Sequence, residues 1–377
     1  MNILMILSHS SDYDPRIFNE ARSLINAGNK VTILEWKKKN QKPSQEVKQG
    51  INIIRSVNTK FMNFLPYDIL RMHRWWVKGY NDAVELHKKQ AFDVVHCHDF
   101  DTLPIGVKLK KKLGLSLIYD ARELWGYMVK RDLPFNLGNY YLLKEKKLIP
   151  YVDGFIIAEE KYAEYYKSFT LKKLTTIMNS RQLISQKYTP PKNEFTLLFI
   201  GRLSSARFVL ELTEVVKGLK SVKCIIGGVG KPEYVNILKQ KCREAKNIDF
   251  IGKIPFEKVI PYTKKSTLVI SMIDPDSFNN KIAMANKQHE AMICGRPIIC
   301  TKDTRSGEIT EHEKCGLVVD YTIEALRAAI IRLRDSPKLC EELGKNALKA
   351  AIDKYNWAIE EKKLLMLYES LKGENKR

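Results

Sequence analysis

Long apolar runs are missing from this sequence. No stretch of about 18 or more consecutive apolar residues occurs, so we expect no segment to span a bilayer. The first seven residues are apolar at once and lack a basic lead-in, which predicts a buried strand and not a signal peptide. With 44% hydrophobic residues, however, the chain can still build packed cores.

Paired cysteines are also missing. The seven cysteines are irregularly spaced and include no Cys-x-x-Cys, which disfavours a structural zinc site. We therefore expect reduced, mostly buried thiols in a cytoplasmic protein.

A Gly-x-Gly-x-x-Gly fingerprint is absent where the first strand ends, which disfavours an ordinary dinucleotide site. Asp14 and Pro15 instead suit a helix start, as an N-cap followed by proline in the first turn. Arg16 would then face a cleft or the solvent. A ligand-binding role for Asp14 and Arg16 remains the alternative.

Negative charge is scarce. The chain has 64 Lys and Arg against 43 Asp and Glu, a net charge of +21. Nucleic acid, anionic lipid or a phosphorylated small molecule could be the partner, and a solvated basic surface is the alternative. The basic residues are spread along the chain without a recognised nucleic-acid motif, so we expect no nucleic acid partner.

Short apolar runs alternate with helical patterns over the whole chain. This predicts an α/β fold of two Rossmann-like, doubly wound parallel-sheet domains facing a cleft. We expect an N-terminal domain at 1–180, a polar linker at 181–194 and a second domain at 195–355. The tail from Thr322 reads as helical with breaks near 336–337 and 355–356, and its last helix, about 356–377, is expected to pack back onto the first domain.

Predicted strands were assigned at 2–7, 30–34, 92–97, 115–119, 154–158, 195–200, 223–227, 248–251, 267–271, 297–300 and 316–319. Ligands of such sheets bind beyond the carboxyl ends of the strands. Polar residues that follow these strands are therefore the candidates for chemistry.

In the first half, His96 and His98 share one side of a strand that ends at Asp99. We favour hydrogen bonding to a sugar over a structural histidine pair, and the stretch offers too few ligands for a metal. Arg122 and Glu123 follow the next strand and suit polyol or phosphate recognition, or an ordinary loop salt bridge.

In the second half, Gly201, Arg202 and Arg207 lie between a strand end and a helix start, where phosphate is favoured. Gly228 would let a ligand approach the backbone closely.

The most specific stretch is 285–299, which predicts a helix leading into a strand. Asn286 and Lys287 open this helix, where Lys287 could hold a phosphate. Glu290, one turn further along, could accept both ribose hydroxyls. A surface ion pair between Lys287 and Glu290 is the alternative.

Over nearly its whole length the chain resembles the family 4 glycosyltransferases, which have the GT-B fold. The segments that carry the resemblance are 14–28, 96–99, 119–124, 201–203 and 286–297. The resemblance implies a nucleotide-sugar donor held by the second domain, an acceptor held mainly by the first, retention of anomeric configuration, and neither a cofactor nor an essential metal. It gives catalytic candidates in His98, Asp99 and Glu123.

For the donor, the resemblance implies that Arg202 or Arg207, with Lys287, neutralises the diphosphate. Two positions depart from the family. Ile282 stands where a second glutamate is frequent, and Arg122 replaces a histidine. Gly307 and Glu308 resemble a later loop near the donor.

Cations and large apolar groups are mixed at 60–66 and 71–76, and a lysine cluster follows at 108–113. This pattern suits an anionic membrane and a lipid-linked or envelope acceptor, with peripheral placement on the inner face of the cell membrane. Packing into a core is the alternative.

A sugar-nucleotide epimerase, a nucleic-acid-binding protein and an inactive transferase-like protein are the rival functions. The sequence names neither sugar, base nor acceptor.

Overall fold

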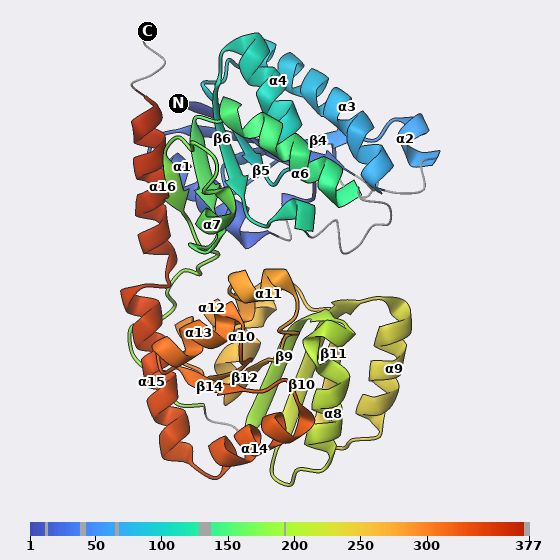
Figure 1. Ribbon diagram of the computed structural model, residues 1–377, viewed down its shortest axis with the longest axis vertical. Coiled ribbons are helices and arrows are strands. Elements are labelled where there is room, and N and C mark those ends of the chain that lie inside the picture. The colour runs from blue at the N-terminus through green and yellow to red at the C-terminus, as the bar shows by residue number, and fades with distance from the viewer. Residues whose placement is uncertain (12–13, 38–42, 65–67, 128–136, 192–193, 373–377) are drawn as a thin grey trace. The chain divides into compact units, whose positions relative to one another are not determined.

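The computed structural model describes residues 1–11, 14–37, 43–64, 68–127, 137–191 and 194–372 (Figure 1). The chain divides into two compact units. Unit 1 comprises Met1–Met178 with Glu360–Arg377, and unit 2 comprises Asn179–Ile359. Each unit is a parallel sheet covered by helices, as the alternating pattern predicts. The chain therefore passes from one unit to the other twice, after Met178 and after Ile359.

Unit 1 has an eight-stranded sheet in the order β3-β4-β2-β1-β5-β6-β7-β8. Its pairs are parallel except for β3 with β4. The strands are β1 (Asn2–Leu7), β2 (Lys30–Lys37), β3 (Gln45–Lys48), β4 (Ile51–Val57), β5 (Val94–His98), β6 (Ser116–Ala121), β7 (Gly154–Ile157) and β8 (Leu174–Thr176).

Helices cover both faces of this sheet. They are α1 (Pro15–Asn26), α2 (Lys60–Phe64), α3 (Asp68–Lys89), α4 (Leu103–Leu113), α6 (Leu137–Leu148), α7 (Tyr162–Tyr166) and α16 (Trp357–Leu371), with a short turn η2 (Ile149–Tyr151). His96 of β5 contacts Tyr368 of α16. The next residue, Cys97, lies against Gly106 of α4, where a Cβ would come within 2.4 Å of its sulfur. Because side chains alternate along a strand, α16 and α4 lie on opposite faces.

The ends of α1 and α4 follow their local sequence. The Asp14 carboxylate accepts from the Ile17 amide at 3.5 Å, and Pro15 occupies the first turn, so the predicted cap of α1 is confirmed. Helix α4 ends at Gly114, whose φ of +72° is the left-handed conformation that glycine adopts without strain.

Unit 2 has a six-stranded, wholly parallel sheet in the order β11-β10-β9-β12-β13-β14. Its strands are β9 (Thr196–Leu203), β10 (Lys223–Gly230), β11 (Ile248–Gly252), β12 (Leu268–Ser271), β13 (Ile298–Thr301) and β14 (Gly316–Val319). Its helices are α8 (Val209–Lys217), α9 (Pro232–Arg243), α10 (Val259–Lys265), α11 (Phe278–Ile282), α12 (Asn286–Ile293), α13 (Arg305–His312), α14 (Ile323–Arg334) and α15 (Pro337–Asp353), with short turns η3 (Ser205–Arg207) and η4 (Phe256–Lys258).

The sheet of unit 2 has an apolar core on each face. One core joins the strands to α8, α9 and α14 through residues such as Leu212, Leu238 and Ile330. The other joins them to α12, α13 and α15 through residues such as Met292 and Ala347. A parallel sheet buried on both faces explains why its strands read as nearly continuous apolar runs.

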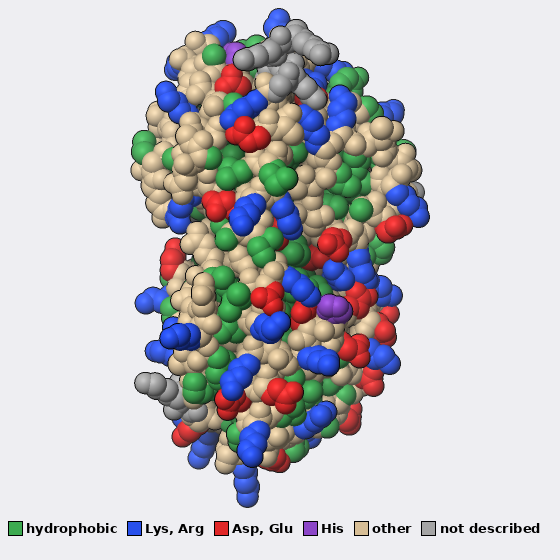
Figure 2. Space-filling view, turned by 90° about the vertical axis from the view of Figure 1, so that its left-hand side faces the viewer, with side chains coloured by type: hydrophobic (Ala, Val, Ile, Leu, Met, Phe, Trp, Pro, Cys, Tyr) green, Lys and Arg blue, Asp and Glu red, His purple; other side chains and the backbone are tan. Residues whose placement is uncertain are grey.

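Every strand predicted above is present, while β3, β4 and β8 were not predicted, nor was the long helix α3. Both predicted breaks in the tail are confirmed, because α14, α15 and α16 are separate helices. All seven cysteines are free and buried, as expected. Among the described residues, no helix combines the length and apolar character needed to cross a membrane. On the face that Figure 2 draws, Lys and Arg side chains are dispersed over both units and do not gather in one field.

Candidate functional site

Two strands of unit 2 come unusually close at their carboxyl ends. Gly201 of β9 pairs with Gly228 of β10. Gly228 has a φ of +141°, and a Cβ on it would lie 1.7 Å from the Gly201 carbonyl oxygen. A side chain at this position is therefore excluded, which leaves bare backbone where ligands of such sheets bind.

Lys287, in the first turn of α12, brings a cation to this place. Its ammonium nitrogen lies 3.5 Å from the centre of the Phe199 ring and 3.6 Å from the point where Gly201 would carry a Cβ. Among the described residues, this buried nitrogen has no hydrogen-bond partner. Burial, and then the positive charge of Arg207, lowers the pKa of Lys287 to about 7. The site thus holds a destabilised cation that an anion would stabilise.

Glu290 lies one turn further along α12 and is only 6% exposed. Its Oε1 accepts a hydrogen bond from Arg181 Nη2 at 3.0 Å. The alternative of a surface ion pair with Lys287 is therefore wrong, because Glu290 is buried and paired with Arg181. The Arg181 guanidinium also lies 5.1 Å from the Phe256 ring centre, so one element just after the crossing from unit 1 holds the carboxylate.

The other predicted donor residues of unit 2 differ in how far they are buried. Arg207 is half-buried and close enough to Lys287 to lower its pKa, whereas Arg202 and Asn286 are exposed. Helix α13 begins with Thr304 capping the Gly307 amide at 3.0 Å. Its exposed Glu308 pairs with Arg305 at 3.3 Å.

Helix α13 is joined to the start of α12. Ser306 Oγ accepts from the Ala285 amide at 3.0 Å, immediately before Asn286. Ile282, which stands where the family often has a glutamate, is half-buried at the end of α11. The hydrogen bond to Ser306 joins the starts of the two helices that carry Lys287 and Gly307.

Unit 1 brings together the polar residues that follow β1, β5 and β6. Arg122 donates to the carboxylates of both Asp14 and Asp99. Burial alone would raise the pKa of Asp14, but the charge of Arg122 and a hydrogen bond from His9 hold it well below its usual value. The loop salt bridge that the sequence offered as an alternative for Arg122 is therefore present.

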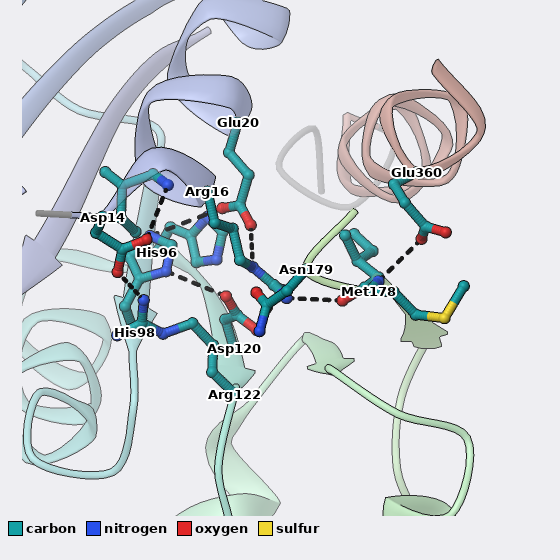
Figure 3. Close-up of polar contacts among 12 residues, drawn as sticks. Asp14, Arg16, Glu20, His96, His98, Asp120, Arg122, Met178, Asn179 and Glu360 are labelled. Atoms are coloured by element: carbon teal, nitrogen blue, oxygen red, sulfur yellow. Dashed lines mark hydrogen bonds and ion pairs between the residues drawn. The ribbon is translucent and has the colours of Figure 1, made fainter. Parts of the chain in front are cut away.

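Two predictions in unit 1 are corrected by the burial of Arg16 and His98, whose polar contacts Figure 3 shows. Arg16 faces neither a cleft nor solvent. It is 2% exposed and donates to Glu20 at 2.7 Å and to Asp120 at 2.8 Å. His98 is 1% exposed, and its Nδ1 lies 3.2 Å from the Asp120 carboxylate. The Asp120 carboxylate therefore holds the His98 side chain inside the unit, and His98 does not lie at the surface, where a sugar would bind.

Asp99 and Glu123 remain at the edge of the sheet. Glu123 is exposed, and Asp99 is partly exposed with a strained φ of +63°. Among the described residues, Asp99 Oδ1 has no hydrogen-bond partner. Asp99 is thus a partly exposed residue whose Oδ1, although buried, is not used as an acceptor by any described residue.

Sequence reasoning missed Glu20, Arg181 and Phe199. Glu20 stands four residues after Arg16, which is the spacing of a helical ion pair, so its role could have been found. Arg181 and Glu290 are 109 residues apart, and no local pattern links them.

The chain is similar to several known proteins. Residues 180–350 match the family described as glycosyl transferases group 1. An uncharacterized glycosyltransferase of Methanocaldococcus jannaschii is 24% identical over 291 residues, covering 75% of this chain and 69% of its own.

Two solved structures show the same fold. Sucrose-phosphate synthase from Thermosynechococcus elongatus superposes with a TM-score of 0.81 at 18% identity, covering 99% of this chain and 100% of its own. Anabaena HepE, solved with UDP-glucose, gives 0.72 at 14%, covering 98% and 100%.

The fold is GT-B, with two parallel-sheet α/β units. The family match covers the donor candidates from Gly201 to Glu308, within the range 180–350. The protein is a glycosyltransferase.

Proposed function

We propose that the protein is a retaining, metal-independent family 4 hexosyltransferase that uses a nucleotide-sugar donor and a lipid-linked or cell-envelope acceptor. The donor would bind unit 2 and the acceptor mainly unit 1. The observation that carries the proposal is the buried, unpartnered ammonium of Lys287 beside the bare backbone of Gly201 and Gly228.

A diphosphate suits this place for two reasons. An anion would supply the hydrogen bonds and the opposite charge that the Lys287 ammonium lacks among the described residues. Arg207 adds a second positive charge nearby. As the sugar departs, negative charge grows on the diphosphate, and fixed cations stabilise it without a metal. The complex of HepE with UDP-glucose is consistent with such a donor.

Glu290 is the proposed partner of the ribose hydroxyls. Its second oxygen, Oε2, makes no ion pair with Arg181, whose Nη2 holds Oε1. A buried, oriented carboxylate can accept from two neighbouring hydroxyls, as the ribose of a nucleotide presents them. Arg181 acts through Glu290, so it would be a positioning residue.

On the acceptor side, Asp99 is the stronger catalytic candidate. Among the described residues, its Oδ1 is buried without a hydrogen-bond partner, and Arg122 donates to its other oxygen. Glu123 is the second candidate. His98, the third candidate that the resemblance gave, would take no direct part, because its side chain is buried.

The first test is a thermal-shift screen of the intact protein against UDP-, GDP-, ADP- and dTDP-sugars. A donor that binds the native state raises the melting temperature, and an excess of about 100 times Kd contributes about 2.7 kcal/mol. We expect one base to stand out, and product analysis should then show transfer with retained configuration. If no nucleotide sugar shifts the transition, the proposed donor site is wrong.

Membrane placement of the acceptor rests on α2 and α3. Phe64 is 85% exposed and Phe61 56%, and Arg74 lies 5.0 Å from the Phe61 ring centre. Exposed aromatic groups beside cations suit an anionic bilayer surface. Trp75 and Trp76 contribute nothing here, because they are buried, and for these two the packing alternative is correct.

Flotation with anionic vesicles tests this surface. We expect the intact protein to float at low salt and Phe64→Ser to lose most of the binding, because an exposed phenyl group contributes about 1.5–3 kcal/mol when buried. Ile237→Ser, an exposed apolar residue of α9 in unit 2, is the matched control. Equal flotation of the two variants would contradict the assignment.

A further inference from the structure

Unit 1 contains a fully buried group of metal-ligating side chains that the glycosyl transfer does not use. Glu20 of α1, His96 and His98 of β5, and Asp120 of β6 each offer one ligand atom, and these atoms all lie within 4.8 Å of one another. All four residues are at most 1% exposed. Figure 3 shows them pointing toward one another.

Three of these atoms lack a partner. Among the described residues, Glu20 Oε2, His96 Nε2 and His98 Nε2 are buried without a hydrogen bond. Leaving one buried polar atom unsatisfied costs about 1–3 kcal/mol, so three in one place indicate that something else satisfies them.

The tautomer of His98 limits which group can satisfy these three atoms. Its Nδ1 faces the Asp120 carboxylate at 3.2 Å and so carries the proton. Its Nε2 therefore presents a lone pair toward Glu20 Oε2, which is 3.9 Å away. Burial raises the pKa of Glu20 to about 8, which favours its protonated form, but at 3.9 Å the two atoms are too far apart for a direct hydrogen bond. They lie about half an ångström beyond the separation of roughly 3.4 Å between two ligands of a tetrahedral zinc ion.

The net charge of this cluster favours a cation over a water molecule as the group that satisfies these atoms. Two carboxylates are present, and Arg16 donates to both, to Glu20 at 2.7 Å and to Asp120 at 2.8 Å. One negative charge is left over within a buried set, and either a proton or a metal ion must compensate it. Tyr368 Oη lies 2.9 Å from Nδ1 of His96, and in the tautomer in which Nδ1 donates to this hydroxyl, Nε2 presents a lone pair to a ligand.

We propose that Glu20, His96 and His98, supported by Asp120, bind one divalent transition-metal ion of the zinc class. Imidazole nitrogen with carboxylate oxygen is the ligand set that such ions prefer. The ion ties α1 to β5 beneath the loops that carry Asp14 and Asp99. It is structural, and it belongs to the unit that does not hold the proposed phosphate site, so it takes no part in neutralising the diphosphate.

The test uses the intact protein, produced in zinc-supplemented medium and purified without chelator. Elemental analysis should find about one zinc per chain. Zinc X-ray absorption should show nitrogen and oxygen ligands at about 2.0–2.1 Å and no sulfur at about 2.3 Å. Less than about a tenth of an equivalent overturns the proposal, and so does sulfur ligation, which would assign the ion to the cysteines.

Variants locate the ion. His96→Gln and Glu20→Gln should each lose it, and Tyr368→Phe, which keeps all ligands, should weaken zinc affinity by about 10-fold or more. His312→Gln, an exposed histidine of unit 2, is the matched control and should keep the full equivalent. Full zinc content in Glu20→Gln and His96→Gln overturns the proposal. Should these two fail to fold, the absorption spectrum of the unaltered protein and the Tyr368→Phe titration decide the question.

Discussion

The two units differ in how their buried cations are partnered. In unit 2, Lys287 is a buried cation without a hydrogen-bond partner among the described residues. In unit 1, each arginine of the network has two carboxylate partners, since Arg16 contacts Glu20 and Asp120 and Arg122 contacts Asp14 and Asp99. Because every cation of this network is matched by carboxylates, the network makes a rigid framework, whereas an unmatched cation can bind an anionic ligand. Two units of the same fold can therefore differ in role: the polar network of unit 1 stabilises the unit, and the Lys287 cation of unit 2 can bind an anion.

Breaking the matched network should have the largest effect. Arg16→Met leaves two buried carboxylates without their shared cation, and removing one partner of a buried ion pair costs about 3–5 kcal/mol. We expect the free energy of unfolding of unit 1 to fall by this amount. Urea unfolding, followed by the fluorescence of the buried Trp36 and Trp75, measures it.

Arg22→Met, on the same helix, is the control for this prediction. Arg22 is half-buried and donates to Gln49 near the surface, so we expect a change within about 0.5 kcal/mol. If both variants lose the same stability, the Arg16 network does not carry the framework of unit 1.

Removing the unmatched charge should affect turnover and not folding. Lys287→Met keeps the length of the side chain against Phe199 but deletes the cation, and losing one such preorganised group costs about 10²–10³ in kcat. The melting temperature without donor should stay the same or rise, because an uncompensated buried charge is gone. Initial rates with the donor found by the thermal-shift screen measure the loss.

Lys302→Met is the matched control, since Lys302 is an exposed lysine of the same unit. Its kcat should equal that of the unaltered protein. Undiminished turnover in Lys287→Met would refute the donor site, and an equal loss in both variants would point to general charge and not to the proposed contact.

The sequence predicted the parts of the fold that depend on local patterns. Buried parallel strands are short apolar runs, and the Asp14 cap and the Gly114 stop need only a few neighbouring residues, so these elements were found. The strand β4 was missed because Arg55 interrupts its apolar pattern. Arg55 is buried only through pairing with Glu35 at 2.6 Å and Glu46 at 2.9 Å, which local patterning does not show.

The part of the candidate site that lies on the single helix α12 could be predicted from the sequence. Lys287 and Glu290 are close in sequence, so their common element was evident. What the sequence could not show was burial. It allowed Arg16 to face outward and left a surface ion pair between Lys287 and Glu290 open as an alternative, whereas tertiary contacts bury Arg16 and pair Glu290 with Arg181. Partners of buried charges come from distant segments, and a single sequence does not reveal them.

The unmatched charge has a further, smaller consequence for pH dependence. With no anion bound, the pKa of Lys287 is about 7. A bound diphosphate raises this pKa, because an opposite charge favours the ammonium. Above pH 7 donor binding must therefore take up a proton, so affinity should fall as the pH rises, by at most about tenfold per unit. Below pH 7 the lysine is already charged, and this dependence should vanish.

Calorimetric titration of the intact nucleotide sugar between pH 6 and 9 measures this effect. A nucleotide sugar is the right probe because its diphosphate carries no terminal phosphate, and a terminal phosphate would titrate near a pKa of about 6. The dependence should be flat for Lys287→Met and unchanged for Lys302→Met. An affinity that stays constant to pH 9 in the unaltered protein would mean that Lys287 is already charged without the donor, and the contrast between the two units would then lose its electrostatic basis.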